Sequence, residues 1–82
     1  MTMRFYTVDD IAYAARFTRA GVYAQVRDGV LPEPIKFGKR ASRWIADEVD
    51  AIFAAREQSK SDDELRALVA NMHAARTSAP AS

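Results

Sequence analysis

The segment Val30-Leu31-Pro32-Glu33-Pro34 constrains the fold more than any other, because it cannot lie inside a helix. Each proline lacks a backbone donor and fixes its own φ angle, so a helix must end before this segment. Gly29 stands directly before it, at the place where helices commonly end in a left-handed residue. The chain is therefore expected to have one helical part on each side of a non-helical middle.

The residues before this segment predict two short helices joined by a tight turn. Thr7 opens an approximate capping box, and acidic residues follow it at the positive end of the helix dipole. Apolar residues at helical spacing predict the first helix over 8–15. Thr18 can cap a second helix that runs to about Asp28. Two helices so closely joined predict a helix-turn-helix, with Phe17 as an apolar plug inside the turn.

The residues after the prolines predict a β-hairpin. Ile35-Lys36-Phe37 alternates apolar and basic side chains, as a short strand does, and Ser42-Arg43-Trp44-Ile45 is expected to be the returning strand. Gly38-Lys39-Arg40-Ala41 supplies a turn between them. Apolar residues follow Trp44, so the indole is expected to anchor the hairpin to the core. Such a hairpin beside a helix-turn-helix is the usual form of a wing.

Two further helices are expected after the hairpin, one ending near Arg56 and one at about 62–75. Acidic residues crowd the start of both, where the helix dipole favours negative charge. The fold class is thus expected to be mainly α with a small β-hairpin, a winged helix-turn-helix plus an extra C-terminal helix. The expected organisation is a winged helix-turn-helix domain at 1–58, a C-terminal helix at 59–76 and a disordered tail at 77–82.

Charge is unevenly distributed along the chain, although the net charge of the 82 residues is only +1. Residues 16–43 carry seven basic and two acidic residues, a net charge of +5, whereas residues 44–82 carry four basic and seven acidic residues, a net charge of −3. A basic patch favours a polyanionic partner, because each phosphate that it neutralises releases counterions. An ordinary solvated surface is the alternative, which charge alone does not exclude.

The composition argues against several other classes of protein. The chain has no cysteine, a single histidine and no paired carboxylates at ligand spacing, so neither a metal site nor a cofactor is expected. A chain this short has little room for a deep catalytic pocket, so no catalytic residues and no enzymatic activity are expected. No apolar run reaches the roughly 18 residues of a membrane span, and no signal-peptide core is present. A cytoplasmic protein without a membrane partner is therefore expected.

Two elements carry the residues that are expected to contact DNA. On the second helix, Arg19 and Arg27 can bind guanine bidentately or clamp phosphate, and Tyr23 can donate to phosphate. The slim basic hairpin can reach the phosphates beside the groove or enter the minor groove. Alternatively, the arginines only solvate the helix, Tyr23 belongs to the core, and the basic strand only blocks aggregation. The candidate set is Thr18, Arg19, Ala20, Tyr23 and Arg27 on the helix, and Lys36, Lys39, Arg40, Ser42 and Arg43 on the hairpin.

Several motifs stand in a characteristic order, and the most specific is Pro-x-Pro-x-Lys-x-Gly at 32–38 followed by Arg43-Trp44. The others are Thr7-Val8-Asp9-Asp10-Ile11-Ala12, Phe17-Thr18-Arg19, Val22-Tyr23, Asp28-Gly29-Val30-Leu31 and Asp47-Glu48-Val49-Asp50-Ala51. This order resembles the AlpA family of prophage regulators, which are small relatives of excisionases with a MerR-like winged helix-turn-helix. The resemblance covers about residues 5–56.

The resemblance implies a bacterial, nucleoid-associated protein that binds double-stranded DNA of a phage or integrative element. It implies either an excisionase, which is a recombination directionality factor that bends attachment-site DNA and acts with a tyrosine recombinase (an integrase), or a transcriptional regulator of integrase or excision genes. Carried over by position, it implies the same DNA-facing residues except Lys36. Ala20-Gly21 and Ala24 depart from the family's hydroxyl and basic residues, which favours backbone and shape contacts over base reading.

The predicted fourth helix lies outside this resemblance. Its apolar stripe is expected either to close the core or to contact a second copy on DNA, which would raise affinity through cooperative assembly. A function of another class, a protein-interaction adaptor that uses the acidic helices at 46–56 and 62–75, is the remaining alternative. The stripe consists of Leu65, Leu68, Val69 and Met72.

Overall fold

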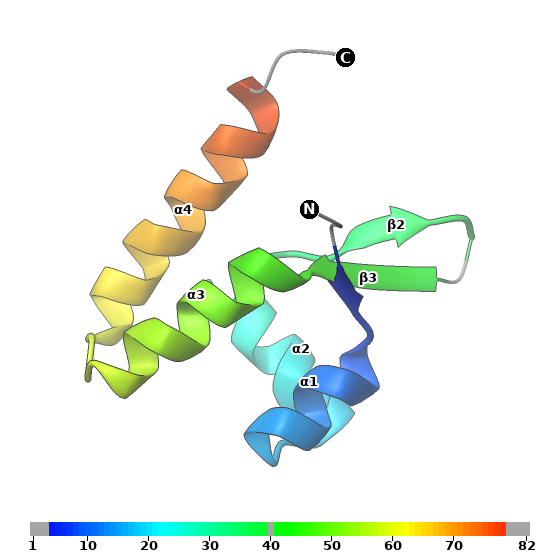
Figure 1. Ribbon diagram of the computed structural model, residues 1–82, viewed down its shortest axis with the longest axis horizontal. Helices are drawn as coiled ribbons and strands as arrows, with labels where there is room; N and C mark the ends of the chain where they lie inside the picture. Colours follow the sequence, from blue (N-terminus) through cyan, green and yellow to red (C-terminus); the bar gives the residue numbers. More distant parts are fainter. Residues whose placement is uncertain (1–3, 40, 79–82) are drawn as a thin grey trace.

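The computed structural model describes residues 4–39 and 41–78, which form four helices around one core and a small sheet (Figure 1). The sheet is antiparallel with the strand order β1-β3-β2, so an additional strand joins the predicted hairpin. The expectation of a mainly helical domain with a small β-hairpin is confirmed at this level. The elements are β1 (Phe5–Tyr6), α1 (Val8–Ala15), α2 (Arg19–Arg27), β2 (Ile35–Phe37), β3 (Ala41–Ile45), α3 (Ala46–Glu57) and α4 (Asp62–Ser78).

Helices α1 and α2 begin and end where their local chemistry predicts. The Thr7 hydroxyl accepts from the Asp10 backbone N–H at 3.1 Å, and the Asp10 carboxylate accepts from the Thr7 N–H at 2.9 Å. The Thr18 hydroxyl caps α2 by accepting from the Gly21 N–H at 3.0 Å. Gly29 follows α2 with a φ of +82°, a conformation that glycine adopts without strain. The two capped helices pack against each other in an arrangement compatible with a helix-turn-helix.

The prediction that Phe17 plugs the turn is wrong. Phe17 is 42% exposed and lies over a shallow apolar hollow between α1 and α3, together with Phe53. Arg16 ends α1 with a φ of +60°, and the buried positions of the two helices are occupied by Ile11 and Val22, which are 1% and 0% exposed. Because these two side chains fill the space between the helices and the core, Phe17 remains at the surface.

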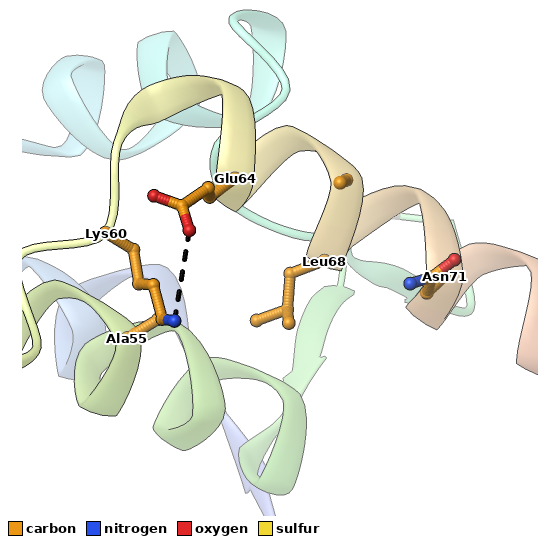
Figure 2. Close-up of a pocket in the computed structure, with 6 residues that line it drawn as sticks. Ala55, Lys60, Glu64, Leu68 and Asn71 are labelled. Atoms are coloured by element: carbon orange, nitrogen blue, oxygen red, sulfur yellow. Dashed lines mark ion pairs between the residues drawn. The ribbon is translucent and has the colours of Figure 1, made fainter.

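A second capping box starts α4 after a short connection from α3. The Ser61 N–H donates to the Glu64 carboxylate at 3.0 Å, and the Glu64 N–H donates to the Ser61 hydroxyl at 3.2 Å. The hydrogen bonds with Ser61 lower the pKa of Glu64. Lys60 lies 3.9 Å from the same carboxylate, at the rim of an apolar hollow between α3 and α4 that Ala55 and Leu68 also line (Figure 2). This junction fixes the point at which the chain turns back.

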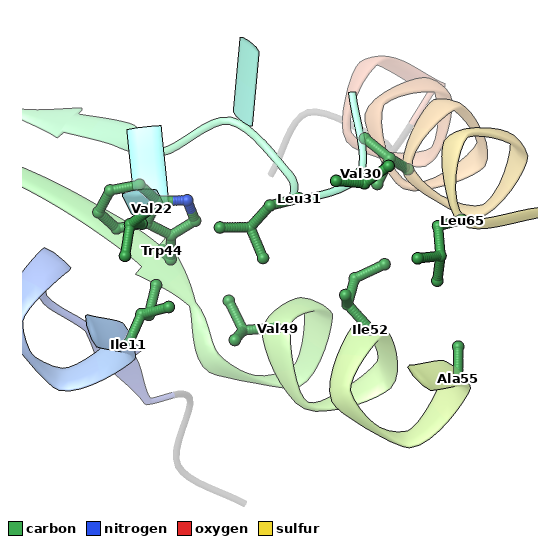
Figure 3. Close-up of a cluster of buried hydrophobic side chains, with 10 residues drawn as sticks. Ile11, Val22, Val30, Leu31, Trp44, Val49, Ile52, Ala55 and Leu65 are labelled. Atoms are coloured by element: carbon green, nitrogen blue, oxygen red, sulfur yellow. The ribbon is translucent and has the colours of Figure 1, made fainter. Parts of the chain in front are cut away.

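Trp44 lies at the centre of the core, as its predicted anchoring role requires. Its indole is fully buried, and Nε1–H donates to the carbonyl oxygen of Pro32 at 2.7 Å. The ring of Tyr23 lies against it, with 5.8 Å between the ring centroids. One side chain of β3 therefore joins the hairpin to both the proline segment and α2. The other core side chains include Ile11, Val22, Leu31, Val49, Ile52 and Leu65 (Figure 3).

The apolar stripe of α4 closes the core. Leu65 and Val69 are 1% and 3% exposed, and Leu68 and Met72 pack against the same cluster while remaining partly exposed. Of the two roles expected for the stripe, core closure is therefore the one that Leu65 and Val69 perform. Self-association through Leu65 and Val69 would require the core to open. A contact between two copies of the protein would therefore have to use Leu68 and Met72.

Helix α4 is longer than the sequence predicts. It spans Asp62–Ser78, so residues 77 and 78, which were expected in a disordered tail, are helical. The remainder of that predicted tail, residues 79–82, lies outside the described residues. Among the helices of the described part, none is long and apolar enough to cross a membrane.

Polar side chains of α4 hold the segment that connects α2 to β2. Arg66 Nε donates to the Asp28 carbonyl oxygen at 3.0 Å, and Arg76 Nη2 donates to the Glu33 carbonyl oxygen at 2.9 Å. The Glu33 N–H donates to His73 Nε2 at 3.1 Å. The helix thereby fixes the backbone that places the hairpin beside α2.

Replacing Trp44 with Phe is expected to lower the free energy of unfolding by about 1–3 kcal/mol or more, because the buried Pro32 carbonyl loses its donor. Urea unfolding followed by circular dichroism measures this change. Tyr13→Phe is the control, since Tyr13 is 88% exposed and a surface change of this kind stays within about 0.5 kcal/mol. Equal unfolding midpoints for the two variants would contradict the role given to Trp44.

Arg76→Ala is expected to cost about 1–3 kcal/mol of stability, because it leaves the Glu48 carboxylate, whose side chain is only 14% exposed, without its ion-pair partner. Lys60→Ala is the control. The Lys60–Glu64 pair has side chains that are 44% and 58% exposed, so its loss should cost at most about 0.5 kcal/mol. Equal losses of stability in the two variants would show that Arg76 does not hold α4 to α3.

Candidate nucleic-acid interface

Predicted DNA-contacting residues of α2 and β3 meet in a shallow polar groove of about 300 Å³. Residues from the start of α1 complete its lining. The two predicted groups are separated by some twenty positions in the chain, and the packing of Trp44 against α2 brings them together. The groove is lined by Arg19 and Tyr23 from α2, by Ser42 and Arg43 from β3, and by Thr7, Val8 and Asp9.

The exposed face of α2 carries the candidate residues of that helix. Arg19, Ala20, Tyr23 and Arg27 are all exposed, and at about 100° per residue they fall within one arc of about 100°. Val22 points away from this arc and is fully buried. The helix therefore presents two arginines and one tyrosine to a partner, and few other side chains that could read a base.

Thr18 and Tyr23 each have a structural contact in addition to their exposure. The Thr18 hydroxyl accepts the backbone bond that caps α2. Tyr23 is 43% exposed while its ring lies against Trp44. One side of the Tyr23 ring therefore packs on the core, and the other side is available for a surface contact.

The register of the hairpin places Lys36 and Ser42 on the same face of the sheet. They are cross-strand partners, and Ser42 is two residues from Trp44, so all three side chains share the face that turns toward the core and α2. Lys36 is exposed and Ser42 is half-buried. Arg43, on the opposite face, is also half-buried, and its Nη1 donates to the Ser42 carbonyl oxygen at 3.0 Å.

The tip of the hairpin projects beyond the helices (Figure 1). Gly38 has a φ of +80°, and a Cβ at this position would meet no described atom within 4 Å, so this turn residue stands clear of the rest of the domain. Lys39 is exposed in the turn. Arg40, the other candidate at the tip, lies outside the described residues.

Arg19 has a carboxylate partner that the sequence did not predict. Its Nε donates to Asp9 Oδ1 at 2.7 Å, and its Nη2 donates to Asp9 Oδ2 at 2.8 Å. The hydrogen bonds from Arg19 lower the pKa of Asp9, and the bonds to Asp9 raise the pKa of Arg19, so both groups are charged at neutral pH. Both residues lie in the first turns of helices joined by a tight turn, and this spacing is the signal that could have identified the pair.

The remaining cations divide into paired and free groups. Within residues 4–39 and 41–78, the exposed Arg27, Lys36 and Lys39 form no ion pair with a carboxylate. The basic residues at and within α4 differ, because all three have acidic partners. Arg16, before α2, and Arg56, on α3, also lack a carboxylate partner among the described residues, so the unpaired positive charge is concentrated on α2 and the hairpin without being confined to them.

Several carboxylates of the acidic helices bond within the chain. Glu48 pairs with Arg76, and Asp50 accepts from the Tyr6 hydroxyl at 2.7 Å, a bond that raises the pKa of Tyr6. Glu64 belongs to the cap of α4. The acidic surface available to a protein partner, which the adaptor alternative requires, is correspondingly smaller than the sequence suggests.

The groove combines guanidinium and hydroxyl donors with one carboxylate. Guanidinium groups bind phosphate oxygens or the O6 and N7 atoms of guanine, and hydroxyl groups bind phosphate. These donors suit a polyanion that offers both phosphate and base edges. Comparisons with known protein families, with curated proteins and with solved structures found no match to this chain.

Proposed function

We propose that the protein binds double-stranded DNA as a winged helix-turn-helix, with α2 in the major groove and the β2–β3 hairpin beside it as a wing. The observation that supports this proposal is the groove where Arg19 and Tyr23 of α2 lie beside Ser42 and Arg43 of β3. A recognition helix contacts bases mainly through its N-terminal residues, and Arg19 is the first residue of α2.

Helix α2 and the β2–β3 hairpin make different contributions to DNA binding in this proposal. The face of α2 is sparse, because Ala20 contributes no polar group beside Arg19 and Tyr23. The helix therefore sets the register on the duplex and reads few bases. Lys36 and Lys39 of the hairpin have no carboxylate partners among the described residues, so they supply sequence-independent affinity through phosphate contacts.

The narrower biological role that we propose is that of an excisionase, acting with a tyrosine recombinase at the attachment-site DNA of a mobile element. The resemblance of residues 5–56 to the AlpA family supports it. Regulation of integrase transcription would use the same contacts, so gene deletion must separate the two. Loss of the excised circular element with an unchanged integrase transcript is expected. An altered transcript, with excision restored by expressing integrase alone, would indicate a transcriptional regulator.

Lys39→Ala is expected to weaken binding to all duplexes alike and to reduce the magnitude of the slope of log K against log salt by about 0.9, the contribution of one phosphate contact. Fluorescence anisotropy over a range of salt concentrations measures both effects. The control is Lys60→Ala, whose side chain lies between α3 and α4. If Lys39→Ala keeps the wild-type slope as Lys60→Ala does, Lys39 does not contact phosphate.

Arg19→Ala is expected to cost about 1–3 kcal/mol on a duplex selected by the wild-type protein from a randomised library, and less on random duplexes, because a guanine contact is lost. Titrations of the two duplexes with each protein give this difference. Equal losses on both would mean that Arg19 contacts only phosphate. A wild-type protein that binds no duplex would overturn the proposed function itself.

A further inference from the structure

We propose that Asp9 is a positioning residue that fixes the direction of Arg19 and thereby sets the base specificity of the protein. This inference rests on the DNA binding proposed above. Asp9 lines the same groove as Arg19, and among the described residues of that lining its carboxylate is the only acidic group. A negative charge at a DNA-binding surface opposes phosphate. The dipole of α1 favours a carboxylate at this position, but it does not account for the two hydrogen bonds that this carboxylate accepts from Arg19.

The geometry of the pair leaves one edge of the guanidinium available. The group is planar and has five N–H donors, of which Asp9 accepts one from Nε and one from Nη2. The donors that remain include both terminal nitrogens, Nη1 and Nη2, along the other edge. Two parallel donors in this arrangement match the O6 and N7 acceptors of guanine. Asp9 therefore holds the arginine without using the edge that reads a base.

Both ends of the pair are carried by the first turns of capped helices. Asp9 lies in the first turn of α1, which Thr7 caps with a complete capping box. Arg19 is the first residue of α2, which Thr18 caps. A long arginine side chain loses rotamer freedom when it binds DNA, and a partner that already restricts it lowers that entropic cost. The pair thus orders Arg19 before DNA arrives.

Stability of the fold does not account for this pair. The two side chains are 69% and 62% exposed, and ion pairs with such exposure contribute little to folding. A simpler electrostatic role, in which Asp9 merely competes with phosphate for Arg19, makes a different prediction. Competition changes the affinity for every duplex alike, whereas positioning changes the ratio between a guanine-containing site and random DNA.

The test replaces Asp9 with Asn and compares it with Asp47→Asn. Asp9 and Asp47 are each the second residue of their helix, so the two variants remove the same charge from equivalent places on the helix dipole. Each protein is titrated with a duplex selected by the wild type from a randomised library, with random duplex, and with selected duplexes that carry 7-deazaguanine at one guanine at a time. The modified base lacks the N7 acceptor.

For Asp9→Asn, the ratio of selected to random affinity is expected to fall about fivefold or more, the lower end of what one bidentate base contact provides. The 7-deazaguanine penalty seen with the wild type should disappear at one position, in this variant and in Arg19→Ala alike. Asp47→Asn should keep both the ratio and the penalty. In an Arg19→Ala background, Asp9→Asn should change the ratio no further.

Three results would overturn the inference while leaving DNA binding intact. One is an unchanged ratio in Asp9→Asn with a uniform gain in affinity, which would identify Asp9 as a competitor of phosphate. Another is that Asp9→Asn lowers the ratio of selected to random affinity as much in the Arg19→Ala background as in the wild type. The third is a wild-type protein that binds duplexes but selects no sequence from the library. Failure of the wild type to bind any duplex would instead overturn the proposed function.

Discussion

The hydrogen bond from the Trp44 indole to the Pro32 carbonyl, inside a fully buried contact, is the interaction on which the rest of the structure depends. It joins the returning strand of the hairpin to the proline segment, and the Tyr23 ring extends the contact to α2. The direction of the hairpin relative to the helix is therefore determined at one buried point. Helix α4 supports that point from outside, because its side chains bond the backbone at Asp28 and Glu33.

This arrangement relates the packing of the domain to its proposed action on DNA. Because the hairpin is fixed beside α2, two groups of donors that are distant in sequence line one groove. The helix offers few reading groups, and its first arginine is already held by Asp9. The hairpin supplies lysines at and near its tip that have no carboxylate partner among the described residues. In this account specificity depends on the direction of one arginine, while affinity depends largely on charge that carries no sequence information.

The sequence predicted the elements whose ends are determined locally. The caps at Thr7 and Thr18, the glycine after α2 and the proline segment are signals within a few residues of the structure that they determine, and all are present in the fold. The surface position of Phe17 was not predicted, because it depends on how α1, α2 and α3 pack in space. The Asp9–Arg19 pair was missed although the tight turn between α1 and α2 is a local signal for it. The apolar stripe of α4 left two roles open for the same reason, since periodicity shows which face is apolar and not what covers it.

The most direct test of the central claim follows the amide chemical shifts of the whole protein by NMR while a random-sequence duplex is added. If α2 and the hairpin bind DNA together, the amides of Gly21, Tyr23, Ser42 and Arg43 will shift or broaden first. Those of Ala67 and Ala70, on the exposed side of α4, will stay unchanged at the same ratio of duplex to protein. Perturbation confined to α3 and α4, or none at any accessible duplex concentration, would contradict the assignment of the groove to DNA.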